Sequence, residues 1–327
     1  MWSAKLVLTL SRFQALARVP TTLLSMVAEY CEPRMIIFGG ASDRGRSTAV
    51  WLRTVGGTNW TQLAEMPTVR IHPAAAVIGD SVYFSGGLEL AGMDCYSLLS
   101  NTWSATDLPR MNHPRTGAAA VSIANQMLVF GGQYTRTLDD GEKFDPVTKR
   151  WLPLRAWTPR YLPCATEWQG RAFVFGGSNS SYHTSNALSS AACYDPVNGV
   201  WHNIRSMKVP RIQATAVAVP GRGVLVMGGW RDEVVMEFQV DYIHHTSCEL
   251  YDPIKNTWTT MPWHLPKPLS GFIAHCLDGV LYILGGASSN VTSSSECFSM
   301  DLDAAVPVWL PLRPLPTQLD SMFSLLV

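Results

Sequence analysis

Met35-Ile36-Ile37-Phe38-Gly39-Gly40 is a short apolar run that ends in two glycines, and the same arrangement occurs six times along the chain. The six glycine pairs are Gly39-Gly40, Gly86-Gly87, Gly131-Gly132, Gly176-Gly177, Gly228-Gly229 and Gly285-Gly286, at successive intervals of 47, 45, 45, 52 and 57 residues. Each run predicts a buried β-strand, because β-branched and aromatic residues pack well on a pleated surface. The glycines allow two backbones to approach closely. A repeat of this length predicts an array of similar sheets.

Each repeat contains further strand and turn signals. In one unit the small residues Ala74–Ile78 predict a strand, and Gly79-Asp80 predicts a two-residue hairpin turn. An aromatic residue precedes a tryptophan by seven positions in four units: Tyr96–Trp103, Phe144–Trp151, Tyr194–Trp201 and Tyr251–Trp258. Trp60 and Trp309 complete a set of six tryptophans. Because burying an indole ring between sheets is worth several kcal/mol, we expect these rings to pack neighbouring sheets together.

These features resemble the kelch repeat, in which a small-residue strand, a strand ending in Gly-Gly, a Tyr-Asp-Pro turn and a tryptophan follow one another. The turn is present in three units, as Asp145-Pro146, Asp195-Pro196 and Asp252-Pro253. The resemblance implies an all-β fold, a six-bladed β-propeller with one four-stranded antiparallel blade per repeat.

The last segment of the chain predicts how the ring closes. Residues 316–327 align with residues 67–78, while no small-residue strand precedes Met35. We therefore expect residues 321–327 to form the missing inner strand of blade 1, so that the propeller spans residues 35–327 and has no open edge. Residues 1–34 predict a short N-terminal helical segment. Three interpretations of it stay open: a helix docked on the domain, a cleaved transit segment, or a partial F-box-like sequence.

Composition limits the possible partners and compartments. The chain has 25 Lys+Arg and 25 Asp+Glu, so no overall charge attracts nucleic acid or an anionic membrane. No run reaches the roughly 20 apolar residues of a membrane span. The seven cysteines form no CxxC pair, which favours the cytoplasm. A mitochondrial location is the alternative, because residues 1–28 contain three basic residues and no acidic one. No phosphate-binding loop, nucleophile elbow or zinc pattern is present, and we expect no cofactor.

The connections between blades carry the candidate binding residues. Because the strands are committed to packing, function is expected on loops. The predicted partner-binding residues are Arg70, His72, Arg110, Arg115, Arg160, Tyr161, Arg211, Trp230, Trp263 and Lys267. Arginine and aromatic side chains around a rim can anchor a protein, and arginine binds carboxylates through paired hydrogen bonds, which predicts an acidic partner segment. In the alternative interpretation the arginines brace loop carbonyls or pair with acids such as Glu142 or Glu233.

A longer loop in the fifth repeat indicates a different class of function. Glu237, Asp241 and His245 are spaced four residues apart. This spacing resembles the iron-ligand motif of kelch-type specifier proteins from plants. On a helix the three residues would share one face and could offer two carboxylates and an imidazole to Fe²⁺. The alternative is a solvated insertion near the rim that binds no metal.

The leading prediction is a non-catalytic, monomeric kelch propeller that binds a protein partner and neither nucleic acid nor a membrane. Many kelch propellers present substrates to cullin ubiquitin ligases, so a role as a ubiquitin ligase adaptor extends this prediction. That role needs a BTB or complete F-box domain, and we find neither in the sequence. The competing prediction is an iron-dependent, lyase-like enzyme that uses Glu237, Asp241 and His245.

Overall fold

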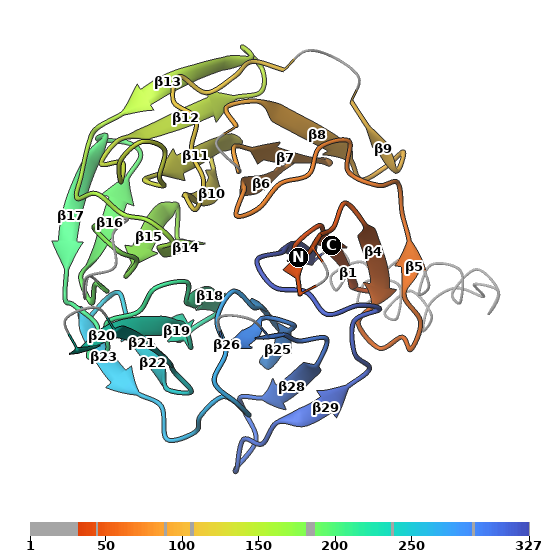
Figure 1. The fold of residues 1–327 in the computed structure, drawn as a ribbon, viewed down its shortest axis with the longest axis vertical. Helices are drawn as coiled ribbons and strands as arrows, with labels where there is room; N and C mark the ends of the chain where they lie inside the picture. Colours follow the sequence, from red (N-terminus) through yellow and green to blue (C-terminus); the bar gives the residue numbers. More distant parts are fainter. Residues whose placement is uncertain are drawn as a thin grey trace, which may run out of the picture.

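Six four-stranded antiparallel sheets surround a central axis like the blades of a propeller in the computed structural model (Figure 1). The structure describes residues 32–43, 45–87, 90–104, 108–180, 187–236, 239–289 and 292–326. The predicted all-β, six-bladed propeller is confirmed, and the described residues form strands and turns only. The predicted N-terminal helical segment falls almost entirely on residues 1–31, which lie outside the described residues.

The blades follow one another along the chain, and within each blade the strands run in order from the innermost to the outermost. Blade 1 consists of β30 (Phe323–Leu326), β1 (Arg34–Phe38), β4 (Val50–Thr54) and β5 (Thr61–Gln62). Blade 2 consists of β6 (Ala74–Ile78), β7 (Ser81–Ser85), β8 (Met93–Ser97) and β9 (Thr102–Trp103). Blade 3 consists of β10 (Ala119–Ile123), β11 (Gln126–Phe130), β12 (Gly141–Asp145) and β13 (Arg150–Leu154).

The second half of the ring repeats this order. Blade 4 consists of β14 (Cys164–Trp168), β15 (Arg171–Phe175), β16 (Ala191–Asp195) and β17 (Val200–Ile204). Blade 5 consists of β18 (Thr215–Val219), β19 (Gly223–Met227), β22 (Cys248–Asp252) and β23 (Thr257–Thr260). Blade 6 consists of β24 (Ile273–Leu277), β25 (Val280–Leu284), β28 (Cys297–Asp301) and β29 (Leu310–Leu312).

The two ends of the blades form two faces of the propeller. One face carries the loops between the second and third strands together with the linkers between blades, and we call it the loop face. The other carries the remaining turns, and we call it the turn face. Three hairpins belong to the loop face: β2 (Ala41–Ser42) with β3 (Gly45–Arg46), β20 (Trp230–Met236) with β21 (Gln239–His244), and β26 (Ala287–Ser289) with β27 (Thr292–Ser293). Within the described residues, no helix is long and apolar enough to cross a membrane.

The C-terminal strand closes the ring as the sequence predicts. β30 pairs antiparallel with β1, with Phe323 opposite Phe38 and Leu326 opposite Met35. The two ends of the described chain therefore lie side by side in blade 1 (Figure 1). Because β30 supplies the innermost strand, the first and last blades share one sheet and expose no edge at the seam.

The Gly-Gly pairs lie where a linker crosses the sheet closely. Gly131 has φ 64°, and a Cβ on it would lie 2.5 Å from the carbonyl oxygen of Arg160. Its neighbour Gly132 donates its amide hydrogen to the same oxygen at 2.7 Å. A side chain at Gly131 would both clash and be strained, so glycine is required at this crossing.

The six predicted tryptophans join consecutive blades. The indole nitrogen of each donates a hydrogen bond to a linker carbonyl of the preceding blade, at 2.7–3.1 Å. The pairs are Trp60 with Pro314, Trp103 with Ala64, Trp151 with Pro109, Trp201 with Arg155, Trp258 with Arg205, and Trp309 with His264. Each indole therefore packs its blade and also fixes the outer end of the linker that leads into that blade.

Candidate partner-binding face

The linkers of the loop face carry two sets of basic residues. Each linker begins at the outer strand of one blade and ends at the inner strand of the next, so its two ends lie at different distances from the axis. We call Arg70, Arg115, Arg160 and Arg211 the inner arginines. We call Arg110, Arg155, Arg205 and Arg313 the outer arginines.

The inner arginines are buried inside the domain, with 0–3% of their surface exposed. Each donates a hydrogen bond from Nη1 to the carbonyl of the first glycine of the Gly-Gly pair that follows it, at 2.5–2.7 Å. The acceptors are Gly86, Gly131, Gly176 and Gly228 in that order. The linker and the blade are thereby tied together at the same point in four repeats.

Three inner arginines also pair with an acid on the third strand of the blade. Arg115 contacts Glu142 at 2.9 Å, and Arg211 contacts Glu249 at 3.1 Å. Arg70 contacts an aspartate, Asp94, at 2.7 Å. The two glutamates also accept hydrogen bonds from their linkers: Glu249, for example, accepts the amide hydrogen bonds of residues 208 and 209. The arginine, the glycine carbonyl and the carboxylate therefore form a buried clamp in each of these blades.

The fourth inner arginine, Arg160, lacks an acidic partner among the described residues. It donates to the carbonyl and hydroxyl oxygens of Ser190, and its guanidinium carbon lies 4.0 Å from the ring centre of Trp157. Burial lowers the pKa of Arg160 to about 9. The cation–π contact and the serine oxygens replace a counter-ion at this site.

These contacts correct the expectation that Arg70, Arg115, Arg160 and Arg211 project from the rim. Their guanidinium groups face the interior, because each satisfies a carbonyl that the Gly-Gly crossing leaves without a strand partner. The inner arginines thus fit the alternative interpretation, in which arginines brace loop carbonyls or pair with acids, and Arg115 does pair with Glu142. Glu233, which is exposed, pairs instead with the partly buried Arg231 at 3.3 Å.

The outer arginines are exposed on the linkers. Arg155 and Arg205 supply the carbonyls that accept tryptophan hydrogen bonds, while Arg110 and Arg313 are sequence neighbours of residues that do so. The exposed His264 has the equivalent place on the linker to blade 6. No outer arginine forms an ion pair with another residue of the described part. The outer arginines and His264 thus form a basic surface that is open to solvent. We call these five residues the outer basic ring.

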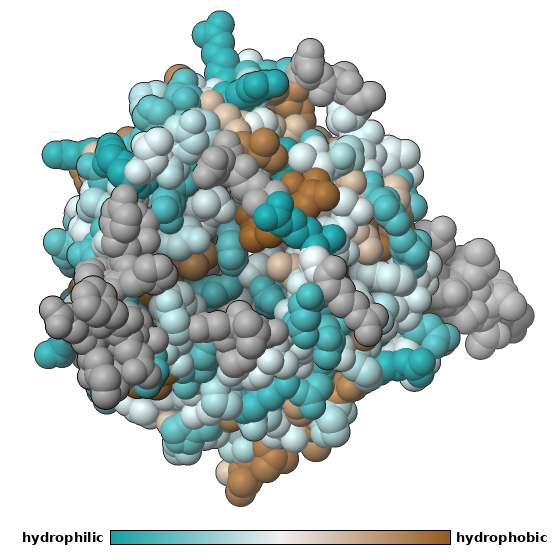
Figure 2. Space-filling view, viewed as in Figure 1, coloured by the Kyte–Doolittle hydropathy of each residue, from teal (hydrophilic) through white to brown (hydrophobic). Residues whose placement is uncertain are grey.

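The mouth of the central channel is formed by the residue two positions before each inner strand. These six residues are His72, Gly117, Leu162, Gln213, Gly271 and Ser321, with φ between 48° and 62°. Backbone hydrogen bonds of 2.9–3.1 Å connect each to the next from His72 round to Ser321. The mouth encloses a cavity of about 180 Å³, and the channel below it has a further 320 Å³. The surface is hollowed near its centre, along this axis (Figure 2).

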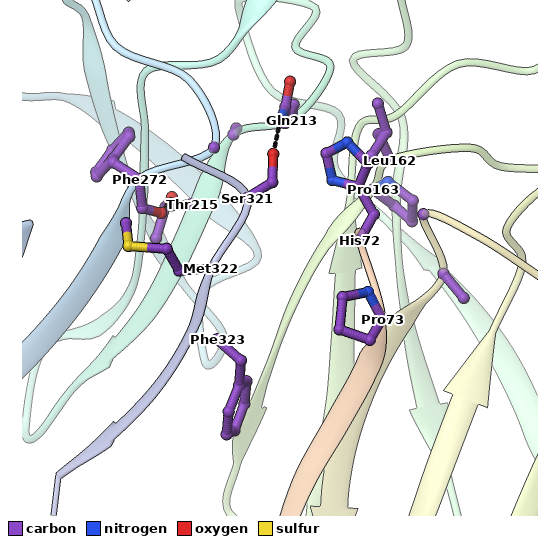
Figure 3. Close-up of a pocket in the computed structure, with 14 residues that line it drawn as sticks. His72, Pro73, Leu162, Pro163, Gln213, Thr215, Phe272, Ser321, Met322 and Phe323 are labelled. Atoms are coloured by element: carbon purple, nitrogen blue, oxygen red, sulfur yellow. Dashed lines mark hydrogen bonds between the residues drawn. The ribbon is translucent and has the colours of Figure 1, made fainter. Parts of the chain in front are cut away.

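Side chains on the seam side of the mouth form a hydrogen-bonded chain. Trp230 Nε1 donates to Gln213 Oε1 at 3.2 Å, and Gln213 Nε2 donates to Ser321 Oγ at 3.0 Å (Figure 3). Ser321 Oγ donates to Asp320 Oδ1, and Ser293 Oγ donates to Asp320 Oδ2, each at 2.6 Å. Of the predicted residues, His72 lines the mouth, and Trp230 contacts the mouth residue Gln213.

Three predicted residues have local structural contacts. Tyr161 pairs by backbone with Ser178, and burial raises the pKa of its phenol. The half-buried Trp263 meets Trp309 edge-on, with ring centres 6.1 Å apart. Lys267 donates to Ser294 Oγ at 2.9 Å and forms an ion pair with Glu296. The fourth remaining residue, Arg110, is exposed in the outer basic ring.

Two of the three iron ligands of the alternative prediction lie in or next to a strand rather than on a helix. Asp241 is in β21 and is exposed, His245 follows the end of that strand, and Glu237 lies outside the described residues. Four residues of extended strand span about 13 Å, too far for two ligands of one metal. Burial, followed by the charges of Arg211 and Arg231, lowers the pKa of His245 to about 4. Among the described residues no group of three or more His, Cys, Asp or Glu side chains is arranged to hold a metal ion.

Sequence reasoning missed Gln213, Ser321 and Asp320 as residues of the mouth. A signal was available, because the alignment of residues 316–327 with 67–78 places Ser321 at the repeat position of His72. The side chain at that position changes from blade to blade, so residue type alone did not reveal it.

Comparison with known proteins identifies the repeat. A family model described as the KLHDC2/KLHL20/DRC7 Kelch-repeats domain matches residues 8–156 and 93–286, which together span residues 8–286. Kelch-like protein 35 from Mus musculus is 26% identical over 252 residues, covering 74% of this chain and 39% of the relative. Alpha-scruin from Limulus polyphemus is 27% identical over 271 residues, covering 76% of this chain and 28% of the relative.

Two further similarities bear on the length and the fold. An F-box/kelch-repeat protein from Arabidopsis thaliana is 28% identical over 158 residues, covering 45% of this chain and 38% of the relative. The match thus covers no more than 39% of any of these three relatives, none of which is named as an enzyme. The solved structure of YjhT superposes with a TM-score of 0.68 at 14% identity, covering 81% of this chain and 91% of that one. At this identity the superposition supports the fold alone.

Proposed function

The chain belongs to the kelch-repeat family, and we propose that it is a non-catalytic, monomeric propeller that binds an acidic segment of a protein partner through the outer basic ring. The observation that carries this proposal is the set of four exposed outer arginines without an ion-pair partner in the described residues. The inner arginines are used by the fold, so the outer arginines are the guanidinium groups of the linkers that remain available.

The outer basic ring suits a carboxylate-bearing partner. Exposed arginine binds carboxylates in a two-pronged geometry and is enriched among the residues that dominate binding energy at protein interfaces. The outer arginines occupy linkers between blades 2 and 3, 3 and 4, 4 and 5, and 6 and 1, so an acidic segment can contact more than one of them. Because such contacts are exposed, the association rate is expected to fall as salt concentration rises.

The cellular role is a further part of the proposal. One relative has an F-box in its name, which supports a role for this propeller as the substrate-binding part of a ubiquitin ligase. We also propose a cytoplasmic location, because all six cysteines in the described residues are free thiols. Co-purification with a cullin scaffold, and fractionation of cells with an antibody to this chain, test these two points.

The direct experiment reverses three outer arginines at once, in the variant Arg110→Glu/Arg155→Glu/Arg205→Glu, which we call the outer reversal. Partner capture from native lysate should fall at least about tenfold, because three carboxylate contacts are lost and repulsion is added. The matched control reverses three exposed basic residues of the turn face, Lys149→Glu/Arg150→Glu/Lys255→Glu. Both variants should keep the melting temperature of the native protein. Undiminished capture by the outer reversal would contradict the proposal.

A further inference from the structure

The channel mouth differs in chemistry from the linkers that surround it. Fourteen residues line the cavity of about 180 Å³, and none of them is Asp, Glu, Lys or Arg. Part of the wall is apolar, formed by residues such as Leu162, Pro163 and Phe272. Seven of the 17 residues that line the deeper channel are alanines, and this lining likewise lacks those charged residue types. A group that enters the mouth from the loop face therefore meets an uncharged, partly apolar pocket.

His72 presents unused hydrogen-bonding capacity to this cavity. Its imidazole lies across the gap from Ser321 (Figure 3) and makes no side-chain hydrogen bond with the described residues. Burial lowers the pKa of His72 despite the opposing attraction of Asp320, so the ring is neutral at neutral pH. A neutral imidazole offers one N–H donor and one nitrogen acceptor.

The backbone at His72 does not itself require the imidazole side chain. His72 has φ 48°, in the left-handed region that favours glycine. Glycine occupies the equivalent position in blades 3 and 6, as Gly117 and Gly271, so the repeat accepts glycine there. The histidine can therefore be replaced by glycine without a conflict with the backbone of the repeat.

Gln213 supplies a second uncharged group on the opposite side of the mouth. Its carbonyl oxygen accepts from Trp230, and its amide nitrogen uses one hydrogen on Ser321. The second amide hydrogen of Gln213 remains available, because a carboxamide nitrogen carries two. The nearby carboxylate of Asp320 already accepts two hydroxyl hydrogen bonds.

We propose that the channel mouth binds one carboxamide side chain, asparagine or glutamine, between the His72 imidazole and the Gln213 amide. A carboxamide carries both a carbonyl acceptor and N–H donors, which complement the acceptor of His72 and the spare N–H of Gln213. A carboxylate cannot donate to the acceptor nitrogen of His72 and is repelled by Asp320. An ammonium group is attracted by Asp320 but offers no acceptor to the spare N–H of Gln213. A cavity of this size is sufficient, because one of about 150 Å³ can hold benzene.

That the carboxamide belongs to the docked protein partner rests on the proposed function. The preference of the pocket for a carboxamide does not. The test therefore uses small probes on the purified full chain: propionamide, propionate, propylammonium and 1-propanol, each observed by saturation-transfer NMR at neutral pH. The propionamide signal should exceed each of the others about tenfold, as expected for at least one additional hydrogen bond in the pocket.

The variant His72→Gly removes the imidazole without threatening the fold, because glycine adopts positive φ readily. It should lose the propionamide signal and keep or raise the melting temperature. Leu162→Gly is the matched control, since Leu162 has the same repeat position with φ 52° and also lines the mouth. It should retain the propionamide signal within about twofold, because no hydrogen-bonding group is lost.

Three results would overturn the proposal: equal signals from all four probes, a 1-propanol signal as strong as that of propionamide, or propionamide binding that persists in His72→Gly. The outer reversal should leave propionamide binding unchanged. If partner capture fails to depend on the outer arginines while the probe pattern holds, the proposed function is wrong and the pocket assignment stands. If partner capture depends on the outer arginines while the probe pattern fails, the pocket assignment is wrong and the proposed function stands.

Discussion

Blades 2 to 5 and blades 6 and 1 use different chemistry at the same point of the repeat. In blades 2 to 5 the inner arginine binds the first glycine carbonyl of the Gly-Gly pair. In blades 6 and 1 the equivalent residues are Leu269 and Leu319, each 1% exposed and part of a hydrophobic cluster between blades. The equivalence is set by the backbone, because the carbonyls of Leu269 and Leu319 accept from the second glycine of the preceding pair, as those of Arg115, Arg160 and Arg211 do.

The residue opposite the clamp changes with it. Where the clamp is arginine, the facing position on the third strand is Asp94, Glu142, Ala192 or Glu249, from blade 2 to blade 5. Where leucine replaces the inner arginine, the facing position on the third strand holds an aromatic residue, Phe298 in blade 6 or Trp51 in blade 1. Blades 2, 3 and 5 thus have a buried ion pair at this point, and blades 6 and 1 have two apolar residues. Blade 4 is the exception, because Arg160 faces Ala192 and binds Ser190 instead.

Removing residues 321–327 should lower the stability of the protein more than any other change proposed for this comparison. The truncation deletes β30 from the apolar seam between blades 6 and 1. β1 would lose its pairing partner and become an exposed edge, so the ring should no longer unfold cooperatively. Circular dichroism during thermal unfolding measures this. A sharp transition near that of the full chain would show that the seam does not hold the ring closed.

Breaking one polar clamp should have the next largest effect. Arg211→Ala leaves the fully buried Glu249 without a counter-ion and should lower the free energy of unfolding by about 3–5 kcal/mol. Denaturant titration gives the value. A loss below about 1 kcal/mol would mean that the buried pair is not the clamp of blade 5.

Replacing the buried ion pair of blade 5 by the apolar pair of blade 6 tests the same comparison further. The variant Arg211→Leu/Glu249→Phe copies into blade 5 the pair that blade 6 uses, Leu269 with Phe298. It should recover at least about 2 kcal/mol relative to Arg211→Ala, because no unpaired buried charge remains. Failure of this rescue would show that blades 5 and 6 differ in more than the clamp.

The smallest effect concerns pH at the seam, where His275 of β24 hydrogen-bonds Ser324 of β30 at 2.7 Å. Burial lowers the pKa of His275 to about 4 from the ordinary 6.5, so the unfolded chain binds the proton more readily. Stability from this group is complete above pH 6.5 and declines as pH falls towards 4. The difference between pH 7 and pH 5 should be about 2 kcal/mol.

His275→Gln should remove that part of the pH dependence, whereas Ser324→Ala keeps the imidazole and should retain it. Denaturant titrations at the two pH values distinguish the variants. An unchanged pH dependence in His275→Gln would contradict the assignment.

The strands were predictable because their signals are local and repeated. The Gly-Gly pairs and the tryptophans mark every blade, and the alignment of residues 316–327 with 67–78 located the closing strand. The alternative iron site in the expanded loop of blade 5 depended on a helix, and the described part of that loop is a hairpin. Residues four apart share a helical face, but the β-branched pair Val234-Val235 lies in β20, part of a hairpin.

The positions of the arginines were only partly predictable. Arg110 and Arg115 are five residues apart on one linker, yet one is exposed and the other is 1% exposed. Nothing local to the linker separates them, because burial depends on the carbonyl of Gly131 and the carboxylate of Glu142, which follow later in the chain. The repeat position of Glu142 carries that information once the blades are aligned.

The division of the linker arginines is tested most directly by their accessibility in the native protein, measured by phenylglyoxal labelling and mass spectrometry. We predict rapid modification of Arg110, Arg155, Arg205 and Arg313, and protection of Arg70, Arg115, Arg160 and Arg211, with the difference abolished in denaturant. Labelling of Arg115 or Arg211 as fast as that of Arg155 would contradict the division of the linkers into a structural inner set and an available outer set.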